Sequence, residues 1–173
     1  ASDVYKRQEI IIKGAALGFA DVPLSEKAPY VIRYAGMIDN WAECDCFCSC
    51  IKVKKSEEDA LRLLSDRLMK RKEEFVSRVG IVLMFSKFTD EPTVKKALDI
   101  YDALPCGAYY RDMAVAWGLS VYCVKYPELI TGYLEHSPIS IKVKLMAAQK
   151  IRDSRRVSDD YKKRITCIVN AQR

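Results

Sequence analysis

The sequence predicts an all-α fold in which antiparallel helical hairpins are stacked as a solenoid. The first observation is periodicity. Apolar residues recur at separations of three and four, as in Leu61, Leu64 and Leu68, and strict alternation over a strand length is scarce. The second is the regular spacing of helix breakers, which leaves only short loops. Because short loops force neighbouring helices to lie roughly antiparallel, the helices are expected to pair as hairpins.

Ten helices are expected between these breakers. In chain order they span residues 7–20, 24–37, 40–51, 57–70, 73–88, 92–103, 107–124, 127–135, 139–153 and 158–170. The main breakers are Pro23, Pro29, residues 52–56, residues 90–92, Pro105 with Gly107, Pro127, and Ser137 with Pro138.

Several of these helices begin at polar residues that can satisfy free backbone N–H groups. Ser56 followed by Asp59 resembles a capping box at the start of the fourth helix. Asp90 is placed to cap the sixth helix, with Pro92 in its first turn. Ser158 precedes two acidic residues at the start of the tenth.

Three unusual residues indicate a repeat. Trp41 and Arg78 are 37 residues apart, and Arg78 and Trp117 are 39 apart. Helix-pair repeats of the HEAT or armadillo type have a period of about 40 residues. Equivalent positions of successive repeats line up along one face of a solenoid, so these three residues are expected to share one groove.

Length and composition predict one globular domain over residues 9–173. The chain has 173 residues, of which half are hydrophobic and 30% charged. Residues 1–8, ASDVYKRQ, have no periodicity and are interpreted as a non-native or disordered start. No secretory signal and no apolar run of membrane-spanning length is present, so we expect a soluble, cytoplasmic protein with reduced thiols.

The positive charge is concentrated at one end of the sequence. The formal net charge is +6, yet residues 142–173 alone hold ten basic and three acidic residues, a net of +7. A localised basic field attracts polyanions, and nucleic acid is the commonest large one in a cytosol. The alternative is a solvated helix face with no ligand.

The segment NWAECDCFCSC, residues 40–50, carries four of the seven cysteines at every second position. In a helix, Cys44 and Cys48 share one side and Cys46 and Cys50 share another, so the four cannot converge on one ion. Structural zinc sites also need ligands at other spacings, and the chain has one histidine. We therefore expect free, core-filling cysteines and no metal site; a thiol or zinc protein is the weaker hypothesis.

Trp41 and Asp45 are four residues apart and so lie on one face of the same predicted helix. An aromatic plane beside a carboxylate suits a cation, because the ring face and the negative charge both attract it. The alternative is a tryptophan packed in the core, with Asp45 capping the helix or exposed.

Arg78 and Trp117 also stand in apolar helices. Arg78 shares a helix side with Val82 and Phe85, so it must either pair with an acid or reach an anion beyond the rim. Trp117 is followed by Gly118, a mid-helix glycine that indicates close approach of another group. Core packing is the alternative for this tryptophan.

Four ordered motifs resemble the DNA alkylation repair family, the AlkD-like glycosylases built from HEAT-like repeats. They are NWAECD at 40–45, FVSRVGIVLM at 75–84, YYRDMAVAW at 109–117 and KIRDSRRVS at 150–158. The likeness runs from about Gln8 to the end of the chain. Family members usually carry further helices before this segment, so the resemblance implies an N-terminally truncated domain.

The resemblance implies a monomeric DNA glycosylase that removes N3- or N7-alkylated, cationic purines from duplex DNA without a metal or organic cofactor. Trp41, Asp45 and Trp117 match the family's catalytic aromatic and acidic positions, and Arg78 matches its arginine on the DNA backbone. The basic residues expected to contact DNA are Lys150, Arg152, Arg155 and Arg156. A noncatalytic HEAT-like protein that binds nucleic acid or protein is the alternative.

Overall fold

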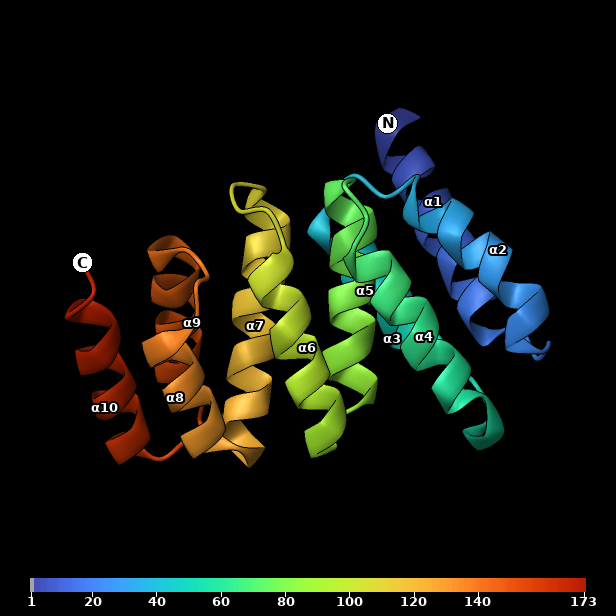
Figure 1. Cartoon of the computed structure of the whole chain (residues 1–173). Coiled ribbons are helices and arrows are strands. Elements are labelled where there is room, and N and C mark those ends of the chain that lie inside the picture. Colours follow the sequence, from blue (N-terminus) through green and yellow to red (C-terminus); the bar gives the residue numbers. More distant parts are fainter. Residues whose placement is uncertain (1) are drawn as a thin grey trace. The chain divides into compact units, whose positions relative to one another are not determined.

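The chain is all-helical, as predicted (Figure 1). The computed structural model describes residues 2–173, with side chains for residue 5 and residues 8–173. Its helices are α1 (Ser2–Phe19), α2 (Leu24–Ala35), α3 (Trp41–Cys50), α4 (Glu58–Met69), α5 (Glu74–Lys87), α6 (Glu91–Ala103), α7 (Tyr109–Lys125), α8 (Pro127–His136), α9 (Ile141–Asp153) and α10 (Asp159–Asn170), with one 3-10 turn, η1 (Lys55–Glu57).

Each of the ten predicted helices is present, and most ends lie within two residues of their expected positions. The largest difference is at α1, which begins at Ser2 and not at residue 7. The expectation of a non-native or disordered start at residues 1–8 falls largely on side chains that lie outside the described residues.

The chain divides into two compact units, Ala1–Met84 (unit 1) and Phe85–Arg173 (unit 2), and the division falls within α5. Unit 1 has 14 basic and 13 acidic residues, a net charge of +1. Unit 2 has 15 basic and 10 acidic residues, a net charge of +5. Most of the positive charge therefore belongs to unit 2.

In unit 1, α1 packs on α3 and α2 packs on α4. The core includes Val31 of α2, Phe47 of α3 and Leu61 of α4, each almost completely buried. Lys27 is also buried, and its Nζ donates to the carbonyls of Lys52 (3.0 Å) and Gly18 (3.4 Å). This lysine joins the end of α1 to the segment after α3.

Helix α5 approaches α4 very closely in unit 1. A Cβ on Gly80 would collide with the backbone nitrogen of Met69 and would lie 2.7 Å from the carbonyl oxygen of Ser65. The Ser77 hydroxyl donates to the carbonyl of Met69 at 2.7 Å. Since only glycine permits this approach, Gly80 determines how α5 presents the side chains on its other faces.

Unit 2 repeats the packing pattern of unit 1. Helix α7 packs on α9 and α8 packs on α10, while α7–α8 and α9–α10 are the sequential contacts. Gln172 closes the end of this unit, because its amide donates to the Leu134 carbonyl (3.1 Å) and accepts from Lys144 Nζ (2.7 Å). Within each unit, helices two apart in the chain are thus in contact, which is how two-layered stacks of hairpins are built.

The helix starts confirm one capping prediction and correct two others. The Asp90 carboxylate accepts from the Thr93 N–H at 3.1 Å, so Asp90 caps α6 as expected. Ser56 does not cap α4, because it lies within η1 and the helix begins two residues later. Ser158 occupies the N-cap position of α10 but makes no capping hydrogen bond with its side chain.

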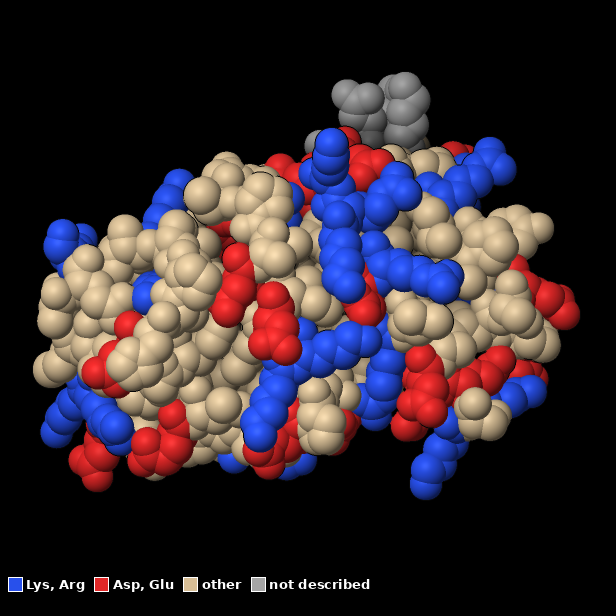
Figure 2. All heavy atoms as spheres, viewed as in Figure 1, with Lys and Arg blue, Asp and Glu red and all other residues tan. Residues whose placement is uncertain are grey.

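Acidic and basic side chains are interspersed on the face seen in Figure 2. Among residues 2–173, none of the helices combines the length and the hydropathy that a membrane-spanning helix requires.

Candidate functional site

Helix α3 presents Trp41 to solvent. The Asn40 side chain accepts from the Glu43 N–H at 3.0 Å, and this cap begins the helix at Trp41. The Trp41 side chain is 56% exposed, so the alternative of a core-packed tryptophan at this position is wrong. An exposed indole at a helix start leaves its ring face open to a ligand.

Asp45 follows Trp41 by just over one helical turn and is held by Arg78 of α5. Arg78 Nη2 donates to both carboxylate oxygens of Asp45, at 2.9 and 3.0 Å, and Arg78 Nε donates to one of them at 3.3 Å. The Asp45 side chain remains 22% exposed, whereas that of Arg78 is 6% exposed. The carboxylate therefore has a fixed orientation and an edge that solvent can reach.

The ion pair decides between the two expectations for Arg78. The sequence leaves open whether this arginine pairs with an acid or reaches an anion, and the structure shows a pair with an acid. A guanidinium that is both buried and charged needs such a partner, because an unpaired buried charge is strongly destabilising. The ion pair therefore joins α3 to α5 and stabilises the buried charge of Arg78.

The cysteine run lies on two sides of α3, as its spacing predicts. Cys44 and Cys48 are buried, Cys46 is exposed and Cys50 is intermediate. Burial raises the pKa of the Cys48 thiol well above its usual value, and the neighbouring Cys44 adds to this effect. In the described part of the chain, no group of three or more His, Cys, Asp or Glu residues is placed to hold a metal ion.

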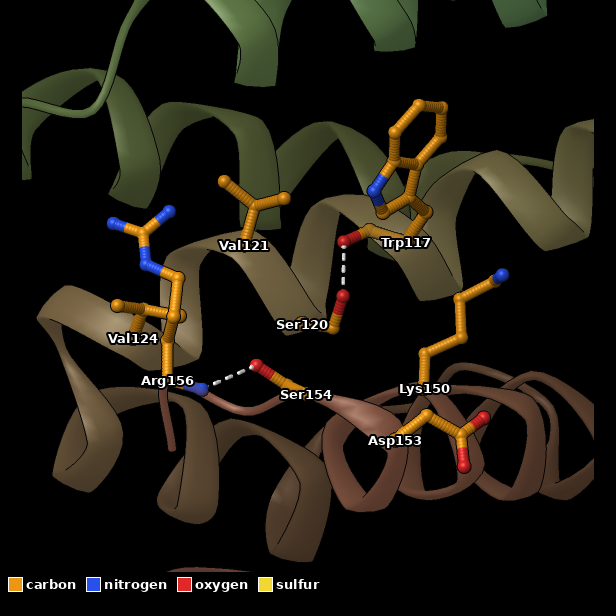
Figure 3. Close-up of a pocket in the computed structure, with 8 residues that line it drawn as sticks. All are labelled: Trp117, Ser120, Val121, Val124, Lys150, Asp153, Ser154 and Arg156. Carbon is orange, nitrogen blue, oxygen red and sulfur yellow. Dashed lines mark hydrogen bonds between the residues drawn. The ribbon is translucent and has the colours of Figure 1, made fainter. Parts of the chain in front are cut away.

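Trp117 belongs to an open pocket of about 330 Å³ in unit 2, shown in Figure 3. Its half-buried indole packs edge-on against Phe85, with ring centroids 4.8 Å apart. A Cβ on Gly118 would lie 2.6 Å from the Tyr101 hydroxyl and 3.1 Å from the Phe85 ring, so the predicted close approach at this glycine is confirmed. Trp117 thus has one packed edge and one surface that lines the pocket.

Two of the four predicted basic residues line the same pocket. Lys150 lies on α9 and Arg156 in the turn that follows it. Arg152 lines a different surface pocket beside α10, where it contacts Gln149 and Thr166. Arg155 is exposed. The four residues are therefore not equivalent, although all belong to one sequence motif.

The predicted site residues fall into two groups. Trp41, Asp45 and Arg78 come together in unit 1, and Trp117 lies with Lys150 and Arg156 in unit 2. All of them belong to odd-numbered helices, except for Arg156 in the turn after α9.

Sequence reasoning missed two polar residues that line the Trp117 pocket, Ser120 and Ser154. Ser120 donates its hydroxyl to the Trp117 carbonyl at 2.7 Å, and Ser154 lies beside Arg156. A signal for Ser120 was present, since it follows Trp117 by three residues and so shares its side of the helix. Ser154 has no such signal, because its place depends on how α9 packs on α7.

No family model, curated protein or solved structure matches the chain.

Proposed function

We propose that the chain is a DNA glycosylase that hydrolyses the N-glycosidic bond of N3- or N7-alkylated purines in duplex DNA, a first step of base excision repair. One observation carries the proposal. The exposed indole of Trp41 lies just over one helical turn from Asp45, whose carboxylate is oriented by the buried Arg78 and still reached by solvent. The resemblance of the four sequence motifs to AlkD-like glycosylases supports the same reaction.

The chemistry suits these residue types. An alkylated purine is a cation, so its glycosidic bond breaks with little help from a general acid. The bonding electron pair leaves with the purine, which becomes neutral, and positive charge develops on the deoxyribose. Asp45 stabilises that charge and orients a water molecule that attacks the anomeric carbon, and the proton of this water is released to the carboxylate or to solvent. The face of Trp41 adds attraction for the cationic sugar.

In this proposal Arg78 is a positioning residue. Its guanidinium holds Asp45 through three donor contacts, two from Nη2 and one from Nε. A carboxylate held in this way has little freedom to rotate, which lowers the cost of aligning it with the reacting sugar. The role differs from the one that the family resemblance implies, a contact between this arginine and the DNA backbone.

The packing of each unit supports a HEAT-like solenoid. Helices α1 and α3, and likewise α7 and α9, contact each other within their units, and the candidate residues lie on this odd-numbered series or directly after it. We propose that a monomer binds duplex DNA and needs no metal or organic cofactor.

A noncatalytic nucleic-acid-binding protein is the second candidate function. Arg78 offsets the charge of Asp45, which weakens its attraction for a cation, and the net charge of +5 on unit 2 suffices to attract DNA. This candidate predicts DNA affinity without release of a base.

The deciding experiment measures 3- and 7-methylpurine release from methylated duplex DNA under single-turnover conditions. Asp45→Asn should lower the rate by about 100-fold to 1,000-fold, as expected when a group that stabilises developing charge is removed. Asp59→Asn is the matched control, because this aspartate of α4 is fully exposed.

The amide introduced by Asp45→Asn would still offer a carbonyl oxygen to Arg78, and circular dichroism checks that the variant folds. Equal rates for Asp45→Asn and wild type would remove Asp45 from the mechanism. Release by neither protein would leave the noncatalytic candidate.

A further inference from the structure

A groove of about 360 Å³ with an apolar floor lies between α6 and α8 in unit 2. Its apolar lining consists of the buried Leu98 of α6 and the half-buried Leu129 and Tyr133 of α8. Gly132 also lines the groove, and a Cβ on this glycine would meet no atom within 4 Å. The groove therefore has room for a side chain supplied by another molecule.

A hydrogen bond joins the two helices that form the groove. The Tyr133 hydroxyl of α8 donates to the Asp102 carboxylate of α6 at 2.7 Å, and it also lies 3.4 Å from the Leu98 carbonyl oxygen. Burial raises the pKa of this hydroxyl and the hydrogen bond with Asp102 raises it further, so the hydroxyl keeps its proton. Because the groove exists before a ligand arrives, binding carries little cost of ordering the protein.

The polar lining of the groove is acidic. It contains Asp99, Asp102 and Glu128 against the single base Lys95, a net charge of 1 − 3 = −2. Unit 2 as a whole has a net charge of +5, so the groove is opposite in sign to the unit that contains it. Figure 2 shows acidic side chains in front of α6. A groove of this sign repels a polyanion such as DNA and attracts a cation.

The negative charge is only partly taken up within the protein. The Lys95 ammonium pairs with Glu91 at 2.7 Å, one turn earlier in α6, so it does not neutralise the acids of the groove. Through residues 8–173, no basic side chain lies within ion-pairing distance of Asp99, which is exposed. Asp99 therefore remains available to a cation at the edge of the apolar floor.

Glu128 shows which cation this surface accepts. Arg164 Nη1 of α10 lies 3.0 and 3.2 Å from its two carboxylate oxygens, and the Tyr161 hydroxyl donates to one of them at 2.9 Å. One acid of the groove is thus already paired with a guanidinium from the same chain. The position beside Asp99 offers the same chemistry to a guanidinium from another chain.

The arrangement of the acids favours an organic cation over a metal ion. Within the part of the chain that the structure describes, no three His, Cys, Asp or Glu side chains converge closely enough to hold a metal ion. An arginine side chain uses both parts of the groove, because its methylene stem packs on apolar surface while its planar head pairs with a carboxylate. The same head also stacks on aromatic rings such as that of Tyr133.

We propose that the groove between α6 and α8 binds an arginine side chain from a basic segment of another protein. The stem of that arginine lies against Leu129 and Leu98, and its guanidinium pairs with Asp99. This is a protein-docking site, so it goes beyond the glycosylase function and does not depend on it.

The experiment measures binding of the hexapeptide RLRLRL, acetylated and amidated at its ends, by calorimetry in the absence of DNA. Asp99→Asn should weaken binding about 2-fold to 5-fold, the range for an exposed ion pair. Gly132→Leu should weaken it about tenfold or more, because the new side chain fills the groove. Asp160→Asn is the charge-matched control, since this exposed aspartate of α10 is not part of the groove, and it should leave the affinity unchanged.

Two further measurements separate the groove from general attraction. Amide NMR signals should shift on peptide addition at Leu98, Leu129 and Gly132, which locates the peptide without any substitution. The peptide ELELEL, in which glutamate replaces arginine, should not bind, because the acids of the groove repel it. Circular dichroism checks the fold of Gly132→Leu, and the Asp99→Asn and NMR results decide the question if that variant does not fold.

Several outcomes would overturn the proposal. Equal losses in Asp99→Asn and Asp160→Asn would indicate diffuse attraction between the peptide and the protein surface. Unchanged affinity in a folded Gly132→Leu protein, or amide shifts confined to other helices, would place the peptide elsewhere. If spermine displaces RLRLRL at an equal concentration of positive charge, the groove is a general polycation site and not an arginine site. Since DNA is absent throughout, none of these results depends on whether the chain releases methylpurines.

Discussion

The two units use their arginines in opposite ways. In unit 1, Arg78 is almost fully buried and its charge is taken up by Asp45. In unit 2, Arg156 is exposed beside an open pocket and is without an ion-pair partner among the described residues. A buried pair gives a carboxylate one fixed orientation, whereas an exposed cation adapts to the ligand that arrives. Unit 1 is thus suited to positioning a reactive group and unit 2 to holding a polyanion.

The largest expected effect tests the rigidity of unit 1. Gly80→Ala should destabilise the protein by about 3 kcal/mol or more, because the new methyl group would collide with the backbone of α4 and neither helix can move cheaply. Gly132→Ala in α8 is the matched control, since nothing lies within 4 Å of its Cβ position. That control should stabilise the protein by about 0.5 to 1 kcal/mol.

Urea unfolding followed by circular dichroism measures both glycine variants. A free energy of unfolding for Gly80→Ala within about 0.5 kcal/mol of wild type would show that α4 and α5 are less tightly fixed than their contact implies.

The second effect compares the two arginines directly. Arg78→Gln should lower the free energy of unfolding by about 2 to 3 kcal/mol, because it leaves the partly buried Asp45 without its partner. Arg156→Gln should change it by less than about 0.5 kcal/mol, since that side chain is exposed.

The same arginines should differ in function as well. Under the proposed function, Arg78→Gln lowers methylpurine release and leaves the salt dependence of DNA binding unchanged, whereas Arg156→Gln lowers that salt dependence. A reduced salt slope for a folded Arg78→Gln protein would instead place Arg78 on the DNA backbone.

A smaller effect is expected from Trp41. Trp41→Ala should lower methylpurine release by about 2-fold to 30-fold, the range expected for a lost contact between a cation and an aromatic face. Trp41→Phe should recover part of the rate. Neither substitution should change the urea midpoint appreciably, because the indole is 56% exposed. A large loss of stability in Trp41→Ala would mean that the side chain packs in the fold.

The smallest effect concerns the thiols of the two units. Cys48 in unit 1 and Cys123 in unit 2 are buried, and burial raises the pKa of the Cys123 thiol to about 11. Both should resist an aromatic disulfide reagent at about pH 8, where little thiolate forms, until the protein unfolds. The exposed Cys46 should react at once. Mass spectrometry of the labelled peptides identifies which residues have reacted.

Local rules predicted the helices well and the capping less well. Asp90 lies directly before a proline-containing first turn, so its cap depends on residues adjacent in sequence. The helix that was expected to begin directly after Ser56 begins instead after Glu57. The Glu57 carboxylate accepts from the Leu24 N–H at 2.6 Å and the Lys54 N–H at 3.2 Å. These hydrogen bonds keep the pKa of Glu57 low, and the contact with Leu24 spans 33 residues that no local rule covers.

The candidate site, like the helix caps, was predictable only where it depends on residues close together in the sequence. Helical spacing alone places Trp41 and Asp45 on one face of α3 and divides the cysteines between two sides. It does not say which side is buried, because that depends on α1 packing against α3. The pairing of Arg78 with Asp45 and the place of Ser154 beside Trp117 depend on tertiary packing between helices, beyond the reach of periodicity.

The chain has two tryptophans, and each unit contains one of them. Trp41 is exposed to water, and Trp117 is half-buried against Phe85, so their intrinsic fluorescence should differ in emission wavelength. A protein with a single Trp→Phe replacement retains one fluorophore, and its emission then reports on one unit. The melting of the two units, and the arrival of a ligand at either, can therefore be followed separately without an added label.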